Sequence, residues 1–309
     1  MTAAPVVSVV IPVHNQAGYV REAVESALDQ SFRDGELILI DDASTDGSWE
    51  AISRYGGLDG VSLHRNERNL DCAATFNLGW RLSRGQYVAI LAADDTWRPD
   101  FLDRCVGALE SHPEAAFAYT RINLIGPDGV RSPRRRDRIP HRGDRCGDDF
   151  GLILCNLNPV PHHATVVRRS CLEEAGGYDE SLVTTHDWDL WLRLSSQYPV
   201  VFLDSHLADY RVHEANVSLR RSSRGEKERF IISLLDRWFE SGELPESIRR
   251  EKPLAYARAW LDIAEGYRMA GERSRMREAF RRALGYTRNP ALYASYRRLM
   301  LEMLFRTGR

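Results

Sequence analysis

Two pairs of adjacent aspartates follow apolar stretches of the chain, and they are the first residues that suggest chemistry. Asp94 and Asp95 end the run "YVAILAADD", and Asp41 and Asp42 end the run "ELILIDD". Adjacent carboxylates repel each other, and their burial is costly unless a cation or hydrogen-bond donors compensate. Carboxylate oxygens are hard ligands suited to Mg²⁺ or Mn²⁺ carrying a diphosphate. The pairs therefore predict a metal and diphosphate site; the alternative is that they cap helices or form salt bridges in loops.

The segments around these pairs alternate between a strand period and a helix period. Strands are expected at residues 6–13, 36–42, 61–66, 86–95 and 115–125, with helical patterns between them. Such alternation predicts a mainly parallel α/β sheet with helices on both faces. Asn15 is a predicted N-cap of the first helix. Because ligands bind beyond the carboxyl ends of such strands, both acidic pairs are expected at the ligand-binding edge.

The second half of the chain is less regular. Residues 126–147 are rich in Gly, Pro and Arg and predict a long loop, after which a helix is expected at 186–197 and a strand at 200–213. From about residue 220 the pattern is helical and predicts packed helices, too few to form a repeat array. We expect a catalytic domain over 1–219, with halves 1–125 and 126–219, and a helical region over 220–309.

Composition is that of an ordinary soluble protein. The chain has 309 residues, of which 43% are hydrophobic and 28% are charged, and its formal net charge is -2. This charge gives no reason to expect a nucleic-acid partner. The five cysteines are scattered and show no C-x-x-C spacing, which favours a reducing compartment. The first residues carry no basic segment, and the sequence has no long apolar run. These features predict a cytoplasmic protein that is at most peripherally attached to the membrane.

Four segments in order carry a family resemblance. "VSVVIPVHNQAGYVREAVESALDQSF", "ELILIDDASTDGS", "NLDCAATFNLG" and "GQYVAILAADDTWRPDFL" resemble the successive motifs of family-2 inverting glycosyltransferases, which have the GT-A fold. The match covers roughly residues 6–218. The resemblance implies an enzyme of bacterial surface polysaccharide or glycoconjugate assembly. It implies a nucleotide-sugar donor, UDP-linked by expectation, a divalent Mn or Mg ion, and a glycan or lipid-linked acceptor.

By this resemblance the first half of the chain binds the nucleotide. The backbone around Pro12, Val13 and Asn15 would line the nucleoside pocket, and Asp42 would hydrogen-bond the base. Asp95 would hold the metal and Asp94 would face the ribose.

The sequence departs from the family pattern at three positions. Ala93 stands where many members have another acid, Asp71 replaces a Gly, and Phe76 replaces an Arg that could touch the nucleotide. Asn69 and Arg68 remain candidates for that contact, and Phe76 is expected in the core.

The second half would supply the catalytic groups. Inverting transfer needs a general base beside the acceptor hydroxyl and a cation on the leaving diphosphate. "TTHDWDLWLRLSSQ" resembles the family segment that holds the base, which assigns this role to Asp187, while Asp189 is expected to cap or solvate the helix. In "YRVHEANVS", His213 would reach the metal or diphosphate, and Arg211 would neutralise phosphate charge. For His163 a structural role and a functional role both stay open.

Other readings of the chain are a nucleotidyltransferase and a non-catalytic nucleotide-sugar-binding or scaffold protein. The first would show a Gly-rich phosphate loop with Lys or Arg after the first strand, and "IPVHNQAG" shows neither. The Arg-rich loop 131–145 could contact a membrane surface, or it could simply be a solvated loop. The basic end 296–309 could contact a membrane or form a homodimer interface, or it could simply be a packed helix.

Overall fold

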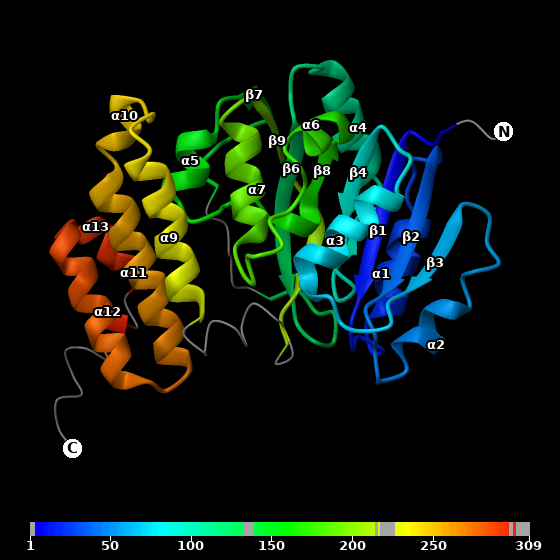
Figure 1. The fold of residues 1–309 in the computed structure, drawn as a ribbon, viewed down its shortest axis with the longest axis horizontal. Coiled ribbons are helices and arrows are strands. Elements are labelled where there is room, and N and C mark those ends of the chain that lie inside the picture. Colours follow the sequence, from blue (N-terminus) through cyan, green and yellow to red (C-terminus); the bar gives the residue numbers. More distant parts are fainter. Residues whose placement is uncertain (1–3, 133–138, 214–215, 217–225, 297–298, 301–309) are drawn as a thin grey trace. The chain divides into compact units, whose positions relative to one another are not determined.

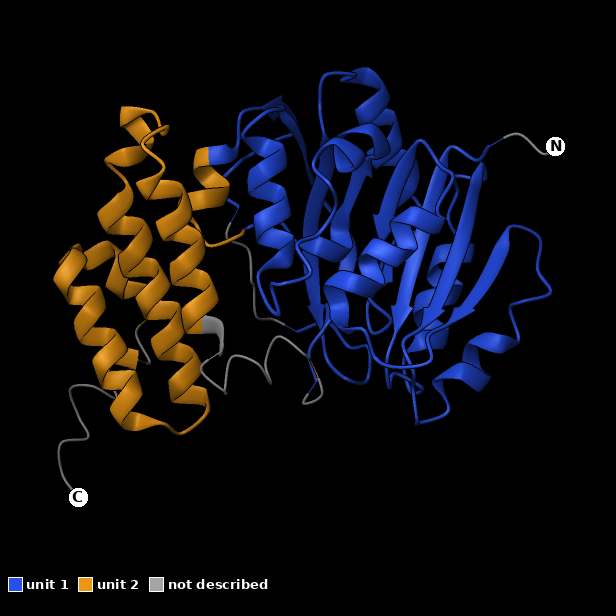
Figure 2. Cartoon of the chain, viewed as in Figure 1, with its two compact units in different colours: residues 1–150, 159–213 blue, residues 151–158, 214–309 orange. Residues whose placement is uncertain are grey.

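The computed structural model describes residues 4–132, 139–213, 216, 226–296 and 299–300. Some of the segments discussed above lie outside this range. They are Arg134 to Arg136 in the Arg-rich loop, Ser218, the predicted boundary at 219 and most of the basic end. The chain divides into two compact units, the first with residues 1–150 and 159–213, the second with residues 151–158 and 214–309 (Figure 2). Each unit is considered by itself.

A mixed sheet of nine described strands forms the centre of the first unit (Figure 1). Its order is β3-β2-β1-β4-β8-β6-β9-β5, and β7 pairs with β9. β1, β2, β3 and β4 are parallel to one another, whereas β8 is antiparallel to both β4 and β6. The strands are β1 (Val7–Val13), β2 (Gly35–Asp41), β3 (Val61–Arg65), β4 (Tyr87–Ile90), β5 (Thr96–Trp97), β6 (Phe117–Ile125), β7 (Arg145–Gly147), β8 (Thr165–Arg168) and β9 (Val200–Arg211).

Helices cover both faces of this sheet, as the alternating pattern predicts. They are α1 (Val20–Leu28), α2 (Ser48–Ser53), α3 (Asp71–Leu82), α4 (Phe101–Ser111), α6 (Arg169–Glu174) and α7 (His186–Ser195), with the 3-10 turn η1 (His162–Ala164). Alternate β1 residues from Val7 to Val13 pack with α1 and α4 in one core. The intervening Val10 faces α3 at Gly79, where a Cβ atom would lie 2.3 Å from the Val10 side chain, so α3 needs glycine to lie this close.

Two local predictions are wrong. Asn15 does not cap α1, whose N-cap is Tyr19; Asn15 instead has a positive φ of 53° and its side chain accepts a hydrogen bond from the Thr45 amide at 2.9 Å. The strand predicted at 86–95 ends at Ile90, and the chain then turns so that β5 can pair with β9. Asp94 and Asp95 therefore lie on a connection beyond the strand end, where their side chains are not bound by the sheet register.

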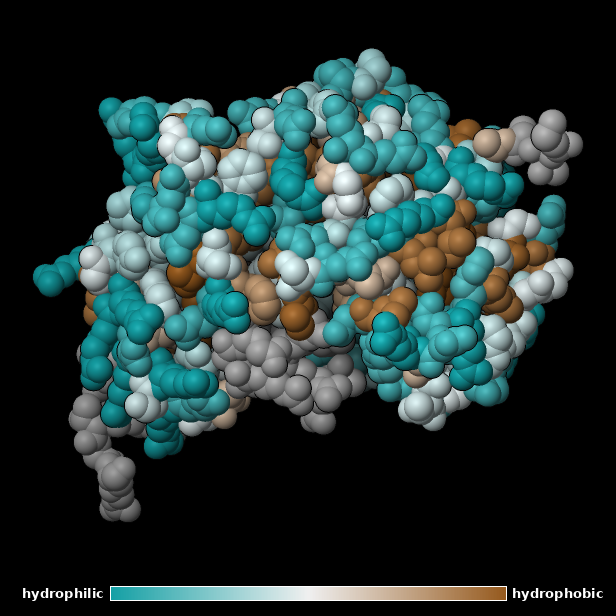
Figure 3. Space-filling model, in the orientation of Figure 1, coloured by the Kyte–Doolittle hydropathy of each residue, from teal (hydrophilic) through white to brown (hydrophobic). Residues whose placement is uncertain are grey.

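The second unit is helical. It contains most of α5 (Phe150–Cys155), together with α9 (Glu226–Glu240), α10 (Glu246–Arg249), α11 (Lys252–Met269), α12 (Arg273–Tyr286) and α13 (Pro290–Ala294). α11 packs against both α9 and α12 through small and aromatic residues such as Ala257, Trp260 and Ala264. Among helices of the described residues, none has both the length and the apolar character needed to cross a lipid bilayer. The face shown in Figure 3 is mainly hydrophilic, with separate hydrophobic patches.

Candidate active site

The pair Asp94 and Asp95 lies beside the end of β9. Asp95 is 1% exposed, and its Oδ1 accepts a hydrogen bond from the Arg211 backbone amide at 2.8 Å. Its Oδ2 lies 3.3 Å from Nδ1 of His163. The Asp94 carboxylate is more open, and its Oδ2 lies 2.9 Å from Nε2 of His213. Segments far apart in the sequence thus bring two carboxylates and two imidazoles together.

This cluster fits a hard divalent cation. Burial, and then the neighbouring Asp94 carboxylate, raise the pKa of Asp95 well above its ordinary value. A buried acid beside a second acid is stabilised in its charged form by a cation. Two aspartates and an imidazole are ligands that Mn²⁺ or Mg²⁺ accepts. The residues around Asp95 therefore suit the metal that the sequence predicts.

Arg211 is a buried residue that connects α1 to the segment of Asp94. Its guanidinium is 1% exposed, donates through Nε to the Asp94 carbonyl at 2.9 Å, and pairs with Glu22 of α1 at 2.6 Å. It also lies over the ring of Tyr19, 4.9 Å from the centroid. These contacts join α1 to the Asp94 segment. The predicted contact between Arg211 and phosphate stays a prediction, and it would require some of these bonds to exchange.

The other acidic pair is surrounded by protein donors. Asp41 is fully buried and pairs with Arg65 at 3.1 Å. Asp42 is 4% exposed, and its Oδ1 accepts hydrogen bonds from the Asn66 side chain at 2.7 Å and from the Leu70 amide at 2.9 Å. Asp41 therefore forms a salt bridge, which was the alternative to a metal site for this pair. Asp42 has a carboxylate oriented at the β2 end by these two donors, and its predicted contact with a nucleoside base stays a prediction.

The residues predicted to line the nucleoside pocket cluster at this same strand end. Val13 is paired with Asp41 in the sheet, and its carbonyl accepts the Asp42 amide at 2.7 Å. His14 Nδ1 donates to the Asp42 carbonyl at 2.7 Å, because a carbonyl oxygen only accepts. The other ring nitrogen, Nε2, therefore accepts from the side-chain Nδ2 of Asn69 at 3.0 Å. Pro12, at the preceding position of β1, is half-buried. Sequence reasoning missed His14, which links β1 to the Asn69 loop.

The departure at Asp71 has a local explanation. Asp71 has a positive φ of 66°, and its amide donates to Oδ1 of Asn69 at 2.7 Å. A glycine adopts this conformation without steric cost, and aspartate is one of the few other residues that tolerates it. The Gly of the family motif can therefore be replaced by Asp here while the backbone keeps its turn.

Asp187 lies in the first turn of α7. It is half-buried. Burial lowers the pKa of His162 and raises the pKa of Tyr178, and the negative charge of Asp187 opposes the first shift and adds to the second. The positive end of the helix dipole favours an ionised carboxylate there. Asp189 is instead buried and pairs with Arg193 at 2.8 Å, and Arg193 in turn donates to the Ala175 and Gly177 carbonyls. Asp189 is therefore a structural anchor of the turn before α7, held by an ion pair instead of a helix cap.

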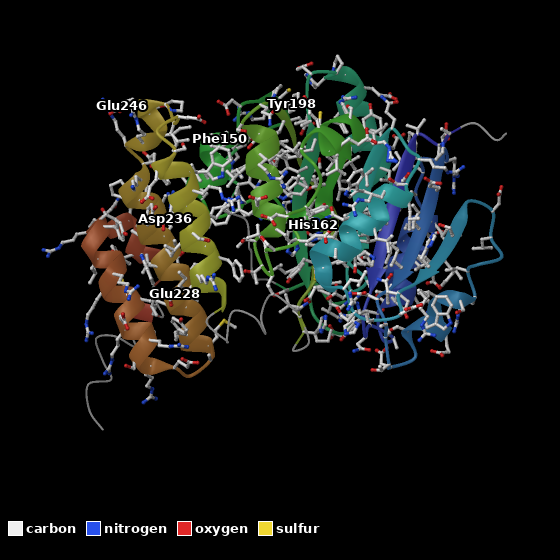
Figure 4. The ribbon with its side chains drawn as sticks, in the orientation of Figure 1. Phe150, His162, Tyr198, Glu228, Asp236 and Glu246 are labelled. Atoms are coloured by element: carbon white, nitrogen blue, oxygen red, sulfur yellow. The ribbon has the colours of Figure 1, made fainter. Side chains whose placement is uncertain are left out.

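The short turn η1 separates the two halves of the site. Its two histidines, His162 and His163, contact different groups: His163 contacts Asp95, whereas Nε2 of His162 lies 2.9 Å from the Tyr178 hydroxyl. Burial lowers the pKa of His162 to about 4, against the opposing charge of Asp187. His162, labelled in Figure 4, stacks on Phe76 of α3 at 4.8 Å and lies 5.9 Å from the Trp191 ring of α7.

This aromatic cluster was not predicted as a unit. Phe76 is 9% exposed, so the expectation that it belongs to the core is confirmed. It also contacts the rings of Tyr178 and His186 at 5.3 Å and 5.4 Å. An arginine at position 76 would place a charge among these rings. The signal available in the sequence was the recurrence of aromatic residues in three separate motifs, but only the fold shows that they meet.

The sequence of the chain matches a known protein family. Residues 8–176 match the family described as Glycosyl transferase family 2, and the chain belongs to it. It is 30% identical over 240 residues to a protein of Bacillus subtilis (strain 168) named glycosyltransferase EpsE, covering 76% of this chain and 80% of EpsE. A second B. subtilis relative, named for teichuronic acid biosynthesis (TuaG), is 28% identical, covering 75% of this chain and 89% of TuaG.

Solved structures show the same fold. Residues 1–349 of S. aureus TarS in complex with UDP-GlcNAc match with a TM-score of 0.58 at 15% identity, covering 94% of this chain and 91% of that one. The Pyrobaculum calidifontis mannosyltransferase PcManGT, solved with GDP-Man and Mn²⁺, matches with a TM-score of 0.62 at 18% identity, covering 98% and 82%. The first unit of this chain therefore has the GT-A fold, as the sequence predicts.

Proposed function

We propose that this chain is an inverting, metal-dependent glycosyltransferase that moves a sugar from a nucleoside diphosphate donor to a hydroxyl group of a glycan or lipid-linked acceptor. The observation that carries the proposal is the arrangement around η1. This turn contacts the buried carboxylate Asp95 through His163, and through His162 it contacts the cluster beside Asp187. A leaving-group site and a base site on one rigid support are what a single displacement requires.

The donor side consists of two subsites. Asp42, held by Asn66 and the Leu70 amide, receives the base, with the backbone around Pro12, Val13 and Asn15 beside it. Asp95 and His213 would hold the divalent ion and Asp94 would face the ribose; the Arg211 amide orients Asp95, and His213 contacts Asp94. Bound there, the ion would neutralise the charge that develops on the leaving diphosphate.

The acceptor side depends on Asp187. In the displacement, the acceptor oxygen bonds to C1 of the sugar, the bond from C1 to the diphosphate oxygen breaks, and that electron pair leaves with the diphosphate. Asp187 takes the proton of the attacking hydroxyl. Asp187 lies in the first turn of α7, at the positive end of the helix dipole.

UDP is the proposed nucleotide, and the acceptor is proposed to belong to a bacterial surface polysaccharide. The TarS complex with UDP-GlcNAc and the name of TuaG support these choices, whereas PcManGT with GDP-Man is the counterexample for the base. A screen of UDP- and GDP-sugars with and without Mn²⁺ decides between them. The readouts are donor hydrolysis and thermal stabilisation, since a ligand that binds only the folded state raises the melting temperature.

Two variants test the assignment of roles. Asp187→Asn should lower kcat by about 10²- to 10⁴-fold with little change in donor affinity, because a general base acts only in the chemical step. The matched control is Asp103→Asn, which changes an exposed aspartate of α4. Donor binding without turnover by the wild-type protein, over a broad acceptor screen, would instead favour a non-catalytic binding protein.

A further inference from the structure

Three side chains of the first unit converge at a place that the transferase site does not use. They are His112, which follows α4, Glu114, two residues further on, and Cys146 of β7. Nδ1 of His112 lies 3.4 Å from Oε1 of Glu114, and Sγ of Cys146 lies 3.6 Å from the same oxygen. One ligand atom from each residue falls within 4.8 Å of the others. None of the three takes part in the proposed donor or acceptor sites.

These separations match the edges of a tetrahedral zinc site. Zn²⁺ binds sulfur at about 2.3 Å and nitrogen or oxygen at about 2.0–2.2 Å. Two tetrahedral ligands are then about 3.4 Å apart for nitrogen and oxygen, and about 3.6 Å apart for sulfur and oxygen. The distances from Glu114 to His112 and to Cys146 have these values. The third edge joins His112 to Cys146 and is at most 4.8 Å long, and the His112 side chain, which is 41% exposed, has room to move toward the thiol.

The backbone that carries the ligands is held on both sides. Arg168 donates to the carbonyls of His112 at 3.3 Å and Ala115 at 3.1 Å, so the turn that presents His112 and Glu114 is tied to β8. Cys146 pairs with Val201 of β9 and packs against the hydrophobic core. Ligands on a fixed backbone lose little entropy on binding a metal.

We propose that His112, Glu114 and Cys146 form a second cation site, separate from the diphosphate site and selective for zinc over Mg²⁺ and Mn²⁺. A thiolate and an imidazole are soft or borderline ligands, which favour zinc, whereas the aspartates of the donor site favour hard cations. With three protein ligands and water at the fourth position, the ion would join the end of α4 to β7. Its role there is to hold that strand in place.

Binding of Zn²⁺ would release the thiol proton of Cys146. Burial and the Glu114 carboxylate raise the pKa of the Cys146 thiol, so the free protein carries S–H at neutral pH. Zn²⁺ forms bonds to sulfur, nitrogen and oxygen, and the thiol proton leaves to solvent. His112 binds through the lone pair of Nδ1 and keeps its proton on Nε2.

The test is a titration of the full chain with Co²⁺ and Zn²⁺ in excess Mg²⁺, which occupies the diphosphate site. The proposal expects one equivalent of Co²⁺ to give thiolate charge-transfer absorption, and one equivalent of Zn²⁺ to remove it and raise the melting temperature. Cys146→Ser should abolish the absorption. His112→Gln and Glu114→Gln should weaken zinc by more than about tenfold, because even residues beyond the metal ligands contribute that much.

Matched variants keep the result interpretable. Cys72→Ser changes another half-buried cysteine, on α3, and should leave the cobalt spectrum unchanged. Asp95→Asn should also bind zinc with wild-type affinity, which makes this proposal independent of the transferase site. Wild-type protein without thiolate absorption at stoichiometric Co²⁺, or Cys146→Ser protein with unchanged zinc affinity, overturns the proposal. Circular dichroism with a chelator present checks that Cys146→Ser and His112→Gln fold without metal.

Discussion

The two acidic pairs have nearly the same sequence and different surroundings. At the end of β2, Asp41 and Asp42 meet an arginine, an asparagine side chain and a backbone amide of the protein. Beyond β4, Asp94 and Asp95 meet two imidazoles and one amide, and the pKa of Asp95 is raised. Protein groups pair with Oδ2 of Asp41 and Oδ1 of Asp42, although Oδ1 of Asp41 is buried without a hydrogen-bond partner among the described residues. The second pair gains more from an added cation, because burial and the neighbouring carboxylate raise the pKa of Asp95.

The contrast teaches that an acidic strand end is not a metal site by itself. Arg65 forms an ion pair with Asp41, which makes that carboxylate a structural group. Its neighbour Asp42 is then the one proposed to orient a ligand. Where histidines replace arginine, the partners can themselves be metal ligands. The predictions below test whether the two pairs differ in this way.

The largest effect is expected at the second pair. Asp95→Asn should lower the transfer rate by about 10²- to 10³-fold, because in the proposed mechanism it removes a charge that would hold the cation on the leaving group. Steady-state kinetics over a range of Mn²⁺ concentrations measures it. Asp103→Asn is the control, and wild-type rates for Asp95→Asn at low Mn²⁺ would contradict the assignment.

The next effect is on stability at the first pair. Arg65→Met leaves the buried Asp41 carboxylate without its cation, and should lower the free energy of unfolding by about 1–3 kcal/mol. Urea denaturation measures this change. Arg54→Met, at an exposed arginine just after α2, should change stability little. An equal loss in both variants would mean that the ion pair contributes nothing specific.

A smaller effect is expected on nucleotide binding. Asn66→Ala removes one of the donors that orient Asp42, at a cost of about 1 kcal/mol, or about fivefold in the dissociation constant of UDP. Calorimetry should show that Mn²⁺ still tightens UDP binding by the wild-type factor. If Asn66→Ala instead reduced the effect of Mn²⁺, the separation between the two pairs would be lost.

The last effect is confined to acid pH. The pKa of His162 is lowered from about 6.5 to about 4 in the folded protein, so below pH 6.5 the unfolded chain binds the extra proton more readily. Stability is therefore lost as the pH falls from 6.5 toward 4. His162→Gln, whose amide can still bond Tyr178, should show a shallower loss when the free energy of unfolding is followed over this range. Parallel curves would contradict the neutral, buried state of His162.

The fold was largely predictable from the sequence because buried parallel strands and amphipathic helices have distinct periods. The GT-A resemblance, the acidic edge and the core position of Phe76 all followed from local patterns. The end of β4 was overestimated, since Leu91 and Ala93 are apolar and buried although they lie beyond the strand. Periodicity detects burial, and a buried loop looks like a continued strand.

The partners of the site residues were not predictable. Arg211, read as a phosphate ligand, has Glu22 and the Asp94 carbonyl as partners, which are 189 and 117 positions away. The contact of His163 with Asp95 and the aromatic cluster around His162 likewise depend on η1, a three-residue turn with no periodic signal. Residue types reveal which groups can react, and the tertiary fold decides which of them meet.

The most direct test of the account compares uridine and UDP binding, with and without Mn²⁺, in wild type, Asp42→Asn and Asp95→Asn. We expect Asp42→Asn to weaken binding of both ligands while Mn²⁺ still tightens UDP binding, and Asp95→Asn to leave uridine binding intact but remove the effect of Mn²⁺ on UDP. An Asp95→Asn protein whose UDP binding still tightens with Mn²⁺ as in wild type would contradict it.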